Sequence, residues 1–591
     1  MRFFFLHPTE ETKSYQKTSE WIVFENPLKT FVIYDHDSER TENEIESFFD
    51  ELSKNNPYYF AGFFSFELSK YLLPLPKQSK PFLIKLPLVY GGFFENYHKV
   101  SWEDTKIDFF IRGFRLEEVF SEYKKNILKI RDLISQGKVY QVNYTFPVVC
   151  EVYGNLMSLF YHLWKNQRTL SSVMVMDSDF SILSVSPEIF FLQREKEILV
   201  KPMKGTQQPS KSLRKLINNI KYLRTNPKEV SENAMIVDLF RNDLGRISEI
   251  GSVKIKNLFA IEIHPTVIQM ITEIQARLRH FPREKRFWET LFPSGSVTGA
   301  PKIEAIKHIQ QLEKYQRGVY TGAIGWLAPK NSFGFFNVAI RTLVVKSNRG
   351  YYYVGSGITY DSHPKSEYKE CLLKSKVLKQ LQRSTKPKYI FTTMKFCGGI
   401  FYFEKSHLER LKATKSFFQI PVNNSKIESK FQRLKKCLKH VKRLVRVHFR
   451  IYQNGKIQIF LDYLSKKKEI IFGISNQPVD EKNLFLYYKT SERSYQVQLD
   501  EAIKTGLDEM LLLNTKNQIT EGTYTNIIIK KNGKFYTPPL SDGLLNGIMR
   551  RKLIQKLKIE ETSLTLDDVK KADCVYFVNS VRGILKGRIK E

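Results

Sequence analysis

Residues 228–245, KEVSENAMIVDLFRNDLG, are the stretch around which the rest of the chain is organised. Apolar side chains recur there at helical spacing, which predicts an amphipathic helix with one buried face. Glu229 and Glu232 lie three residues apart near its start, so both carboxylates share one face of the helix. The helix would hold these two acids rigidly on one wall of a site.

A second acidic stretch follows residues 361–364, DSHP. Asp or Ser as N-cap and Pro in the first turn are typical of a helix start. The helix would carry Glu367, Glu370 and Lys374. Two helices that each offer a Glu-x-x-Glu pair could bind a divalent cation between them, and carboxylate oxygens suit Mg²⁺. Such pairs are also common on solvated helix faces and in salt bridges, so both interpretations stay open at this point.

The composition predicts a soluble, cytoplasmic protein of several domains. The 591 residues are 42% hydrophobic and carry a net charge of +33, from 94 Lys and Arg against 61 Asp and Glu. Lysine is spread along the chain rather than gathered in a stripe, which is more typical of proteome-wide composition or of a preference for anionic substrates than of nucleic acid as the main partner. Five scattered cysteines without a C-x-x-C indicate a reducing compartment. We find no signal peptide and expect no membrane partner.

The chain is expected to fold as a β-rich N-terminal part and two catalytic units. The expected divisions are residues 1–112, 113–380, a polar linker at 381–388, and 389–591. The strands and the helix expected in the first part of the chain are residues 21–24, 31–34, 58–66, 82–84, 117–136, 139–149 and 181–185.

Three further segments could carry chemistry in the first catalytic unit. Lys204 lies in KPMKGT between a proline turn and a glycine, where a surface lysine is the usual case. Residues 293–302, PSGSVTGAPK, form a small-residue loop whose backbone N–H groups would suit an anion. Arg341 ends an apolar strand and would point into a cleft, or equally extend to water.

The ordered motifs KVYQVNYT, SPEIFF, PMKGT, KEVSENAMIVDLFRNDLGR, PSGSVTGAPK, RGVYTGAIGW, AIRT and GSGITYDSHPKSEYKECLLK resemble those of the chorismate-utilising enzymes over residues 115–380. The resemblance implies a large α/β sandwich of antiparallel sheets. It also implies Mg²⁺ bound by Glu232 and Glu370, with Glu229 and Glu367 acting through water. The substrate-binding residues that it implies are Tyr320, Arg341, Gly355, Ser356, Gly357, Lys374, Thr298 and Gly299.

Lys204 distinguishes two branches of that family. Members similar to anthranilate synthase carry Ala in this motif, whereas members similar to aminodeoxychorismate synthase carry Lys. A neutral lysine amine can attack the chorismate ring at C2 and expel the C4 hydroxyl, after which ammonia adds at C4 and the lysine leaves. Burial and a nearby Mg²⁺ would both lower the pKa of Lys204.

The C-terminal unit contains three residues that could form a second site. Lys489 ends the apolar run LFLYYK, read as a strand, so its amine could lie in a dry pocket. Glu521 is placed in a turn before the strand 526–529, and Gly547 precedes a helix whose first N–H groups would face an anion. Each is more often a structural strand end, turn or loop residue. An earlier helix, 406–418, brings His407 and Arg410 to one face.

Together these features resemble the class IV pyridoxal-phosphate enzymes, and the match is strongest over residues 506–552. The resemblance implies that Lys489 binds the cofactor as a Schiff base and that Glu521 pairs with the pyridinium nitrogen. Arg410 and the backbone at Thr525–Asn526 and Ile548–Met549 would bind the phosphate. Threonine is usual at position 549, so one side-chain contact would be lost there. The end of the chain, NSVRG at 579–583, also resembles lyase domains fused in this way.

The two halves imply consecutive reactions: amination of chorismate to 4-amino-4-deoxychorismate, then elimination of pyruvate to give 4-aminobenzoate, a folate precursor. We find no Gly-x-Cys-x-Gly glutaminase motif, so ammonia is expected from a separate glutamine amidotransferase subunit. Three alternatives remain: a structural C-terminal unit that leaves a one-step enzyme, a component similar to anthranilate synthase, and nucleic-acid binding as the main activity.

Overall fold

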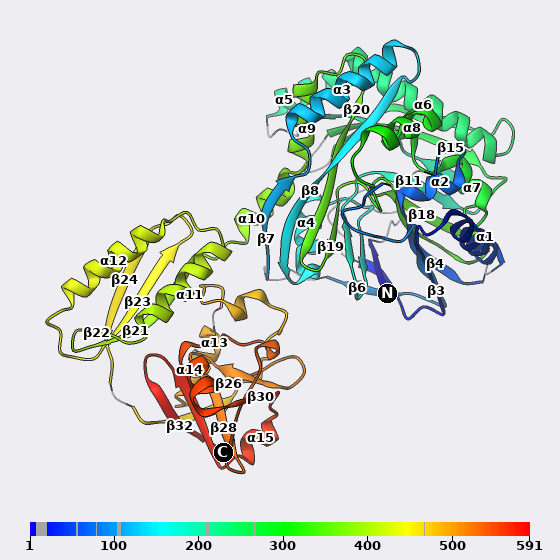
Figure 1. The fold of residues 1–591 in the computed structure, drawn as a ribbon. Helices are drawn as coiled ribbons and strands as arrows, with labels where there is room; N and C mark the ends of the chain where they lie inside the picture. The colour runs from blue at the N-terminus through cyan, green and yellow to red at the C-terminus, as the bar shows by residue number, and fades with distance from the viewer. Residues whose placement is uncertain are drawn as a thin grey trace. The chain divides into compact units, whose positions relative to one another are not determined.

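The computed structural model describes residues 1–6, 20–54, 57–77, 80–102, 108–207, 210, 212–263, 268–465, 467–493 and 495–590. The chain divides into two compact units (Figure 1). The first comprises Met1–Lys106, Gly113–Val152 and Met157–Leu381, and the second Ile107–Arg112, Tyr153–Leu156 and Gln382–Glu591. Each unit has its own hydrophobic cores.

The first unit contains two ten-stranded sheets, and all of its described strand pairs are antiparallel. In spatial order the first sheet contains β16 (Gly299–Ala300), β8 (Gln141–Gly154), β20 (Arg349–Ile358), β19 (Thr342–Lys346), β10 (Ser181–Ser184), β9 (Val173–Met176), β1 (Arg2–Leu6), β2 (Glu20–Glu25) and β6 (His98–Ser101), and β7 (Phe109–Leu116) pairs with β8. The second contains β13 (Met203–Gln207), β15 (Ile268–Arg277), β12 (Glu197–Val200), β11 (Ile189–Arg194), β18 (Phe333–Val338), β17 (Ala323–Leu327), β4 (Tyr59–Phe64), β5 (Val89–Phe94) and β3 (Lys29–Ile33), and β14 (Lys254–Ile263) pairs with β15. The predicted antiparallel sandwich is confirmed.

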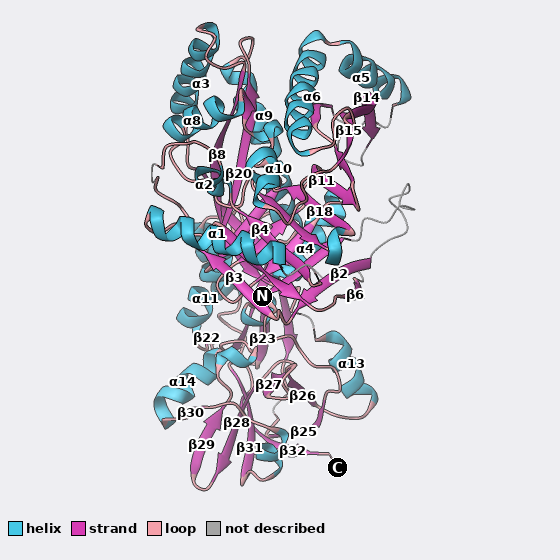
Figure 2. Ribbon diagram, turned by 90° about the vertical axis from the view of Figure 1, so that its right-hand side faces the viewer, coloured by secondary structure: helices cyan, strands magenta, loops and turns pink. Residues whose placement is uncertain are grey.

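Two apolar layers stabilise this sandwich. Aromatic side chains such as Phe24 of β2 and Trp326 of β17 pack between the sheets. On the outer face of the second sheet, Phe48 of α1 (Ser38–Lys54), Phe240 of α6 (Pro227–Ile247) and Trp288 of α7 (Lys285–Leu291) belong to another core. The other helices of this unit are α2 (Ser69–Leu72), α3 (Phe120–Ser135), α4 (Leu156–Gln167), α5 (Leu213–Thr225), α8 (Lys302–Leu312), α9 (Pro364–Lys374) and α10 (Lys376–Ser384). Helices α3 and α9 pack together beside β20, as Figures 1 and 2 show.

Several local predictions for the first unit need correction. Residues 82–84 form no strand, and helix α1 was not predicted. Helix α9 has His363 as N-cap, not Asp361 or Ser362. Ser362 is instead buried in the preceding turn, where its Oγ accepts a hydrogen bond from Thr359 N and donates one to Glu367. Ser362 therefore binds the Glu367 carboxylate instead of capping the helix.

The second unit contains two sheets. A four-stranded sheet has the order β22 (Ile400–Phe401), β21 (Tyr389–Cys397), β23 (Val445–Tyr452), β24 (Ile457–Tyr463), and α11 (Glu404–Phe417) and α12 (Asn424–Cys437) pack against one of its faces. An eight-stranded sheet has the order β27 (Ile519–Gly522), β26 (Glu509–Leu513), β25 (Glu469–Ile474), β32 (Gly583–Ile589), β31 (Cys574–Asn579), β28 (Asn526–Lys531), β29 (Lys534–Thr537), β30 (Glu560–Glu561). Its helices are α13 (Gln496–Lys504), α14 (Ile548–Leu557) and α15 (Leu566–Lys570).

Two predictions for this part of the chain are also wrong in detail. Leu484–Tyr487 is a 3-10 helix, so Lys489 does not end a strand. It follows in an extended segment, where its carbonyl accepts a hydrogen bond from Phe391 N at 3.0 Å. Glu521 lies within β27 rather than in a turn. The polar segment 381–388 begins as the end of helix α10, which continues to Ser384, and the two units divide between Leu381 and Gln382. Among the described residues, no helix combines the length and the apolar character needed to cross a membrane.

Candidate active sites

Lys204 lies where three segments of the first unit meet. Strand β13 pairs with β15 and places Lys204 opposite Met270. The Nζ atom of Lys204 donates a hydrogen bond to the Ser296 carbonyl at 3.3 Å. A Cβ added to Gly357 of β20 would lie only 3.4 Å from the same Nζ. The absence of a side chain at position 357 therefore leaves room beside the Lys204 amine.

Glu188 adds an acid to this site that the sequence analysis did not assign. Its side chain is 3% exposed, and its Oε1 accepts a hydrogen bond from Ser296 Oγ at 2.5 Å. Burial raises the pKa of Glu188 to about 7, although the Ser296 hydrogen bond and the Lys204 charge oppose that rise. The carboxyl group can therefore gain or lose a proton near neutral pH. The motif SPEIFF, which contains Glu188, is the sequence feature from which this acid could have been predicted.

The predicted metal ligands lie on α6 and α9. A Cβ added to Gly205 would lie 2.8 Å from Glu229 Oε2, so this acid borders the residue after Lys204. Glu367 accepts a hydrogen bond from Ser362 Oγ at 3.0 Å, and Glu370 pairs with Lys374 at 2.8 Å. Glu232 lies one turn after Glu229 on α6.

Among the described residues, no group of three or more His, Cys, Asp or Glu lies close enough to hold a metal ion. Mg²⁺ usually keeps several waters and joins one or two carboxylates to an anionic substrate, so it does not need three protein ligands. Glu370 is 52% exposed and reachable by solvent. Carboxylate oxygens are donors that suit Mg²⁺, and α6 and α9 each offer two of them.

Several predicted substrate-binding residues converge on β20. Lys374 Nζ donates a hydrogen bond to the Gly355 carbonyl at 2.7 Å. Arg341 lies between β18 and β19 at a left-handed φ of 52° and is close to Tyr352. Burial raises the pKa of Tyr352, and the Arg341 guanidinium opposes that rise. Ser356 Oγ and Tyr123 Oη are 3.0 Å apart. The ring of Tyr320 stacks on Tyr353 with centroids 5.3 Å apart.

The segment PSGSVTGAPK is not the exposed glycine loop that the sequence predicted. Residues 293–300 are all buried. Gly295–Val297 form a 3-10 turn and Gly299–Ala300 pair with β8, while the Thr298 carbonyl accepts a hydrogen bond from Asn143 N at 2.8 Å. Thr298 and Gly299 therefore attach this segment to β8 next to Lys204. The Ser296 carbonyl accepts a hydrogen bond from Lys204, and the Ser296 hydroxyl donates one to Glu188.

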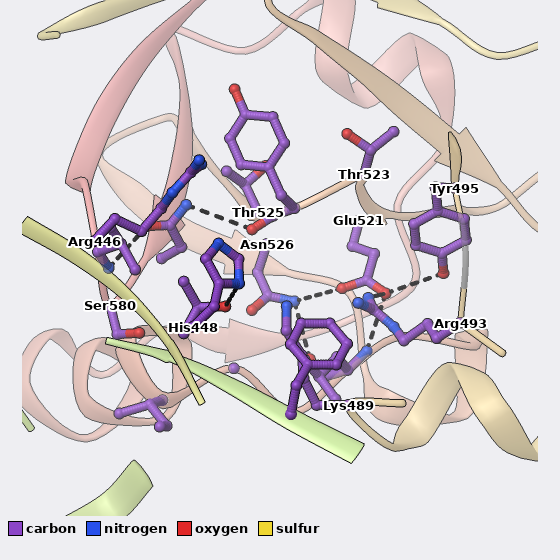
Figure 3. Close-up of a pocket in the computed structure, with 18 of the residues that line it drawn as sticks. Arg446, His448, Lys489, Arg493, Tyr495, Glu521, Thr523, Thr525, Asn526 and Ser580 are labelled. Carbon is purple, nitrogen blue, oxygen red and sulfur yellow. Dashed lines mark hydrogen bonds and ion pairs between the residues drawn. The ribbon is translucent and has the colours of Figure 1, made fainter. Parts of the chain in front are cut away.

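A cavity of about 530 Å³ in the second unit contains Lys489 (Figure 3). Burial lowers the pKa of Lys489 to about 7, and the nearby charges of Arg493 and Arg410 add to this, whereas Glu521 opposes it. A large fraction of the amine is therefore neutral and nucleophilic at neutral pH.

Glu521 is held at the cavity wall by four donors. Its side chain is 2% exposed and forms an ion pair with Arg493. Asn526 Nδ2 and Leu545 N each donate to it at 3.1 Å, and Tyr495 Oη at 3.4 Å. Figure 3 shows Arg493 and Tyr495 around this carboxylate. Neither residue was predicted from the sequence, although both follow Lys489 closely in KTSERSY.

The predicted phosphate contacts divide into two groups. Gly547 is the N-cap of α14, and Thr525, Asn526, Ile548 and Arg410 line the cavity. Met549 is not among the lining residues; its side chain packs against an apolar cluster that includes Leu553. The Thr525 hydroxyl donates a hydrogen bond to Glu509 at 2.6 Å. The backbone N–H groups of this loop, rather than that hydroxyl, would therefore bind an anion.

The cavity fits pyridoxal phosphate in size and in chemistry. A low-pKa lysine suits its aldehyde, a buried carboxylate suits its ring nitrogen, and a helix N-terminus beside an arginine suits its phosphate. Arg410 Nε is buried without a hydrogen-bond partner among the described residues, as is the Thr490 hydroxyl at the same wall. These unsatisfied donors point to a polar ligand in this cavity.

Comparison with known proteins identifies two joined regions. The family model for chorismate binding enzymes matches residues 10–380, and the model for class IV amino-transferases matches residues 389–588. Aminodeoxychorismate synthase component 1 of Bacillus subtilis is 33% identical over 260 residues, 43% of this chain and 54% of that protein. Anthranilate synthase component 1 of Neisseria meningitidis serogroup B is also 33% identical over 260 residues, 43% of this chain and 52% of that protein.

Solved structures show the same fold in the first unit. Anthranilate synthase component I of Streptococcus pneumoniae aligns with a TM-score of 0.54 at 23% identity, covering 61% of this chain and 92% of that one. The chain spans about half the length of the curated relatives that it matches.

Proposed function

Because the chain belongs to the family of chorismate-binding enzymes, we propose that it makes 4-aminobenzoate in two steps. The first unit aminates chorismate to 4-amino-4-deoxychorismate, with ammonia from a separate glutamine amidotransferase. The second unit eliminates pyruvate from that product. The single observation that carries the proposal is Lys204 beside Glu188, because an amine and an acid with a pKa near 7 suit displacement of a hydroxyl group.

In the first step Lys204 Nζ attacks ring C2 as the C4–O bond breaks. Glu188, positioned by Ser296, donates the proton that lets the C4 oxygen leave as water. Ammonia then forms a bond to C4, the ring double bond shifts back, and the bond between C2 and Lys204 breaks. The amine is restored with its electron pair, and excess protons return to Glu188.

The remaining groups of the first unit bind and orient the substrate. Glu232 and Glu370 would hold Mg²⁺, with Glu229 and Glu367 acting through water, and the ion would supply positive charge for the ring carboxylate. Arg341 and the backbone of 355–357 would hold carboxylate. Tyr320, Lys374, Thr298 and Gly299 would line the rest of the substrate site.

In the second unit Lys489 would bind the aldehyde carbon of pyridoxal phosphate, and Glu521 would pair with its ring nitrogen. Arg410 and the backbone at 525–526 and 548–549 would bind its phosphate. When bound, the cofactor supplies an electron sink for the substrate amine. Lys489 takes the proton from C4 of the substrate and delivers it to the methylene carbon of the departing enolpyruvyl group. Pyruvate leaves and the ring becomes aromatic.

A product assay tests the proposal. The purified chain is incubated with chorismate, ammonium and Mg²⁺, with and without pyridoxal phosphate, and the products are identified by mass. We expect 4-aminobenzoate and pyruvate when the cofactor is present. Anthranilate would favour the other branch, whose members match equally well, and would contradict the role of Lys204. Accumulated aminodeoxychorismate would leave the first step standing and remove the second.

The same assay tests the partner and the metal. Glutamine in place of ammonium should give no product until a glutamine amidotransferase is added. Chelation of Mg²⁺ should stop the first step, while elimination from supplied aminodeoxychorismate should continue. These activities would place the chain in cytoplasmic folate biosynthesis.

A further inference from the structure

One wall of the second cavity is a row of basic side chains on β23. Arg446, His448 and Arg450 alternate with Val447 and Phe449. The apolar pair packs with α11 and α12, while the three basic residues line the cavity. Alternation along a strand sends successive side chains to opposite faces, so the whole row faces the cavity. None of these three residues has a role in the function proposed above.

Two members of the row are electrostatically satisfied or uncharged. Arg446 pairs with Asp462 of β24, with Nη2 and Nε at 3.0 and 3.3 Å from the same carboxylate oxygen. Burial lowers the pKa of His448 to about 4; the charges of Arg446, Arg450 and Lys489 act in the same direction, and Asp462 opposes them. His448 is therefore neutral at pH 7.

Arg450 is different because its charge has no counter-ion. Its guanidinium lies between the rings of Tyr389 and Phe460, 4.8 and 4.5 Å from their centroids. Its Nε is buried, and within the part of the chain that the structure describes the Arg450 side chain forms no hydrogen bond or ion pair. The two rings fix the direction of the cation through cation–π contacts and leave its N–H donors free. Such a group favours a carboxylate ligand.

The charge of the whole cavity also indicates an anionic ligand beyond the cofactor. Glu521 is the one carboxylate among its described lining residues, against six basic side chains, Arg410, Arg446, Arg450, Lys489, Arg493 and Arg582. Arg493 is paired with Glu521 and Arg446 with Asp462. Arg410 is assigned to the cofactor phosphate. Arg582 Nη1 donates a hydrogen bond to the Ser465 carbonyl at 3.3 Å, and its charge acts on the carboxylate of Asp508. Arg450 remains as a fixed charge for the substrate.

The position of Arg450 relative to Lys489 selects the type of substrate. Phe391 of β21 is directly opposite Arg450 in the sheet, and its ring centroid lies 5.2 Å from Lys489 Nζ. Directly opposite residues on neighbouring strands have Cβ atoms about 5 Å apart. The guanidinium itself lies against Tyr389, whose ring centroid is 5.9 Å from that of Phe391, so aromatic rings of β21 line the path from the amine to the guanidinium. An α-amino acid carries its amine and carboxylate on one carbon, whereas a ring substrate can place them on opposite sides of a six-membered ring.

We propose that Arg450 binds the ring carboxylate of a substrate whose reacting amine lies across a six-membered ring from it. This subsite rests on the proposed function, since aminodeoxychorismate and 4-aminobenzoate both have that arrangement. It makes Arg450 the residue that selects ring amines over α-amino acids in this cavity.

Binding of two matched probes tests the subsite. The full chain, loaded with pyridoxal phosphate, is titrated calorimetrically with 4-aminobenzoate and with 4-aminobenzamide, which lacks the carboxylate. We expect Arg450→Met to weaken the binding of 4-aminobenzoate at least about tenfold, because one charge-assisted hydrogen bond is lost. Binding of 4-aminobenzamide should stay as in the parent chain, and Arg450→Lys should recover part of the difference.

Arg443→Met is the matched control, because Arg443 also stacks on a tyrosine, Tyr463, but lies outside the cavity. It should leave both affinities unchanged. Bound-cofactor absorbance and urea unfolding show whether each variant is folded. Equal affinities of the parent chain and Arg450→Met for 4-aminobenzoate, or an equal loss for both probes, would overturn the proposal. A parent chain that makes no 4-aminobenzoate from chorismate would instead refute the proposed function, and the difference between probes would still stand.

Discussion

At the scale of single residues, the environment of each amine determines what it can do. Burial disfavours the ammonium form of Lys489, and the charges of Arg493 and Arg410 in the same cavity add to this effect. Glu188 shows the converse effect, because burial disfavours its carboxylate form. One site thus gains a neutral nucleophile and the other gains an acid, although both operate at the same pH.

The lowered pKa of Lys489 predicts how cofactor binding depends on pH. Only the neutral amine reacts with an aldehyde, and its fraction falls about tenfold per pH unit below the pKa. In stopped-flow mixing of cofactor-free chain with pyridoxal phosphate, the rate constant should rise with pH and level off above a pKa of about 7. Arg410→Gln should move this bend to higher pH. A rate that still rises tenfold per unit at pH 9 would show that the pKa is not lowered.

At the scale of elements, side chains from neighbouring elements meet at two glycines of the first site. A Cβ at position 357 of β20 would lie 2.1 Å from Nε2 of Gln141 on β8, besides its contact with Lys204. The Glu229 carboxylate of α6 reaches Gly205 of β13, which has φ +75°. Packing of these elements, rather than the acidic helix alone, brings amine and acids together.

A methyl group at position 357 should therefore damage the first reaction. Gly357→Ala would displace Gln141 and crowd Lys204, and we expect its kcat for amination to fall by about tenfold or more. Elimination from supplied aminodeoxychorismate should be unchanged. Gly245→Ala on α6 is the control, because no atom lies within 4 Å of the added Cβ. It should keep activity and stabilise the chain by about 0.5–1 kcal/mol in urea unfolding. Full amination activity in Gly357→Ala would contradict this account.

At the scale of the whole molecule, the two units have separate cores and separate lysines. The chemistry of each site can therefore be removed without unfolding the other. The described lining residues of the second cavity all lie beyond position 388 and so belong to the second unit.

Complementation between two variants tests this independence. Lys204→Ala should make no aminodeoxychorismate but should convert it when it is supplied. Lys489→Ala should accumulate it from chorismate and ammonium. A mixture of the two chains should form 4-aminobenzoate, whereas the double variant should form none, alone or with added cofactor. A mixture that stays inactive while each variant keeps its single activity would show that the intermediate is not released from the first unit.

The sequence by itself determined the fold class and the order of the two units, because helical and strand periodicity are local and the family motifs are long. It also singled out Lys204, Lys489 and Glu521. It failed at residues 484–487 and at the cap of α9, where a short apolar run and three adjacent polar residues allow more than one local structure.

Only the tertiary structure decided the partners of the reactive groups. Ser296 is 92 residues from Lys204 and 108 from Glu188 along the chain, so their contact depends on how β13, η2 (Gly295–Val297) and the start of β11 are brought together. Arg446 and Arg450 look equivalent in the sequence, yet one faces Asp462 across the sheet and the other two aromatic rings. Burial and counter-ions set charge and pKa, and both depend on neighbours that periodicity does not encode.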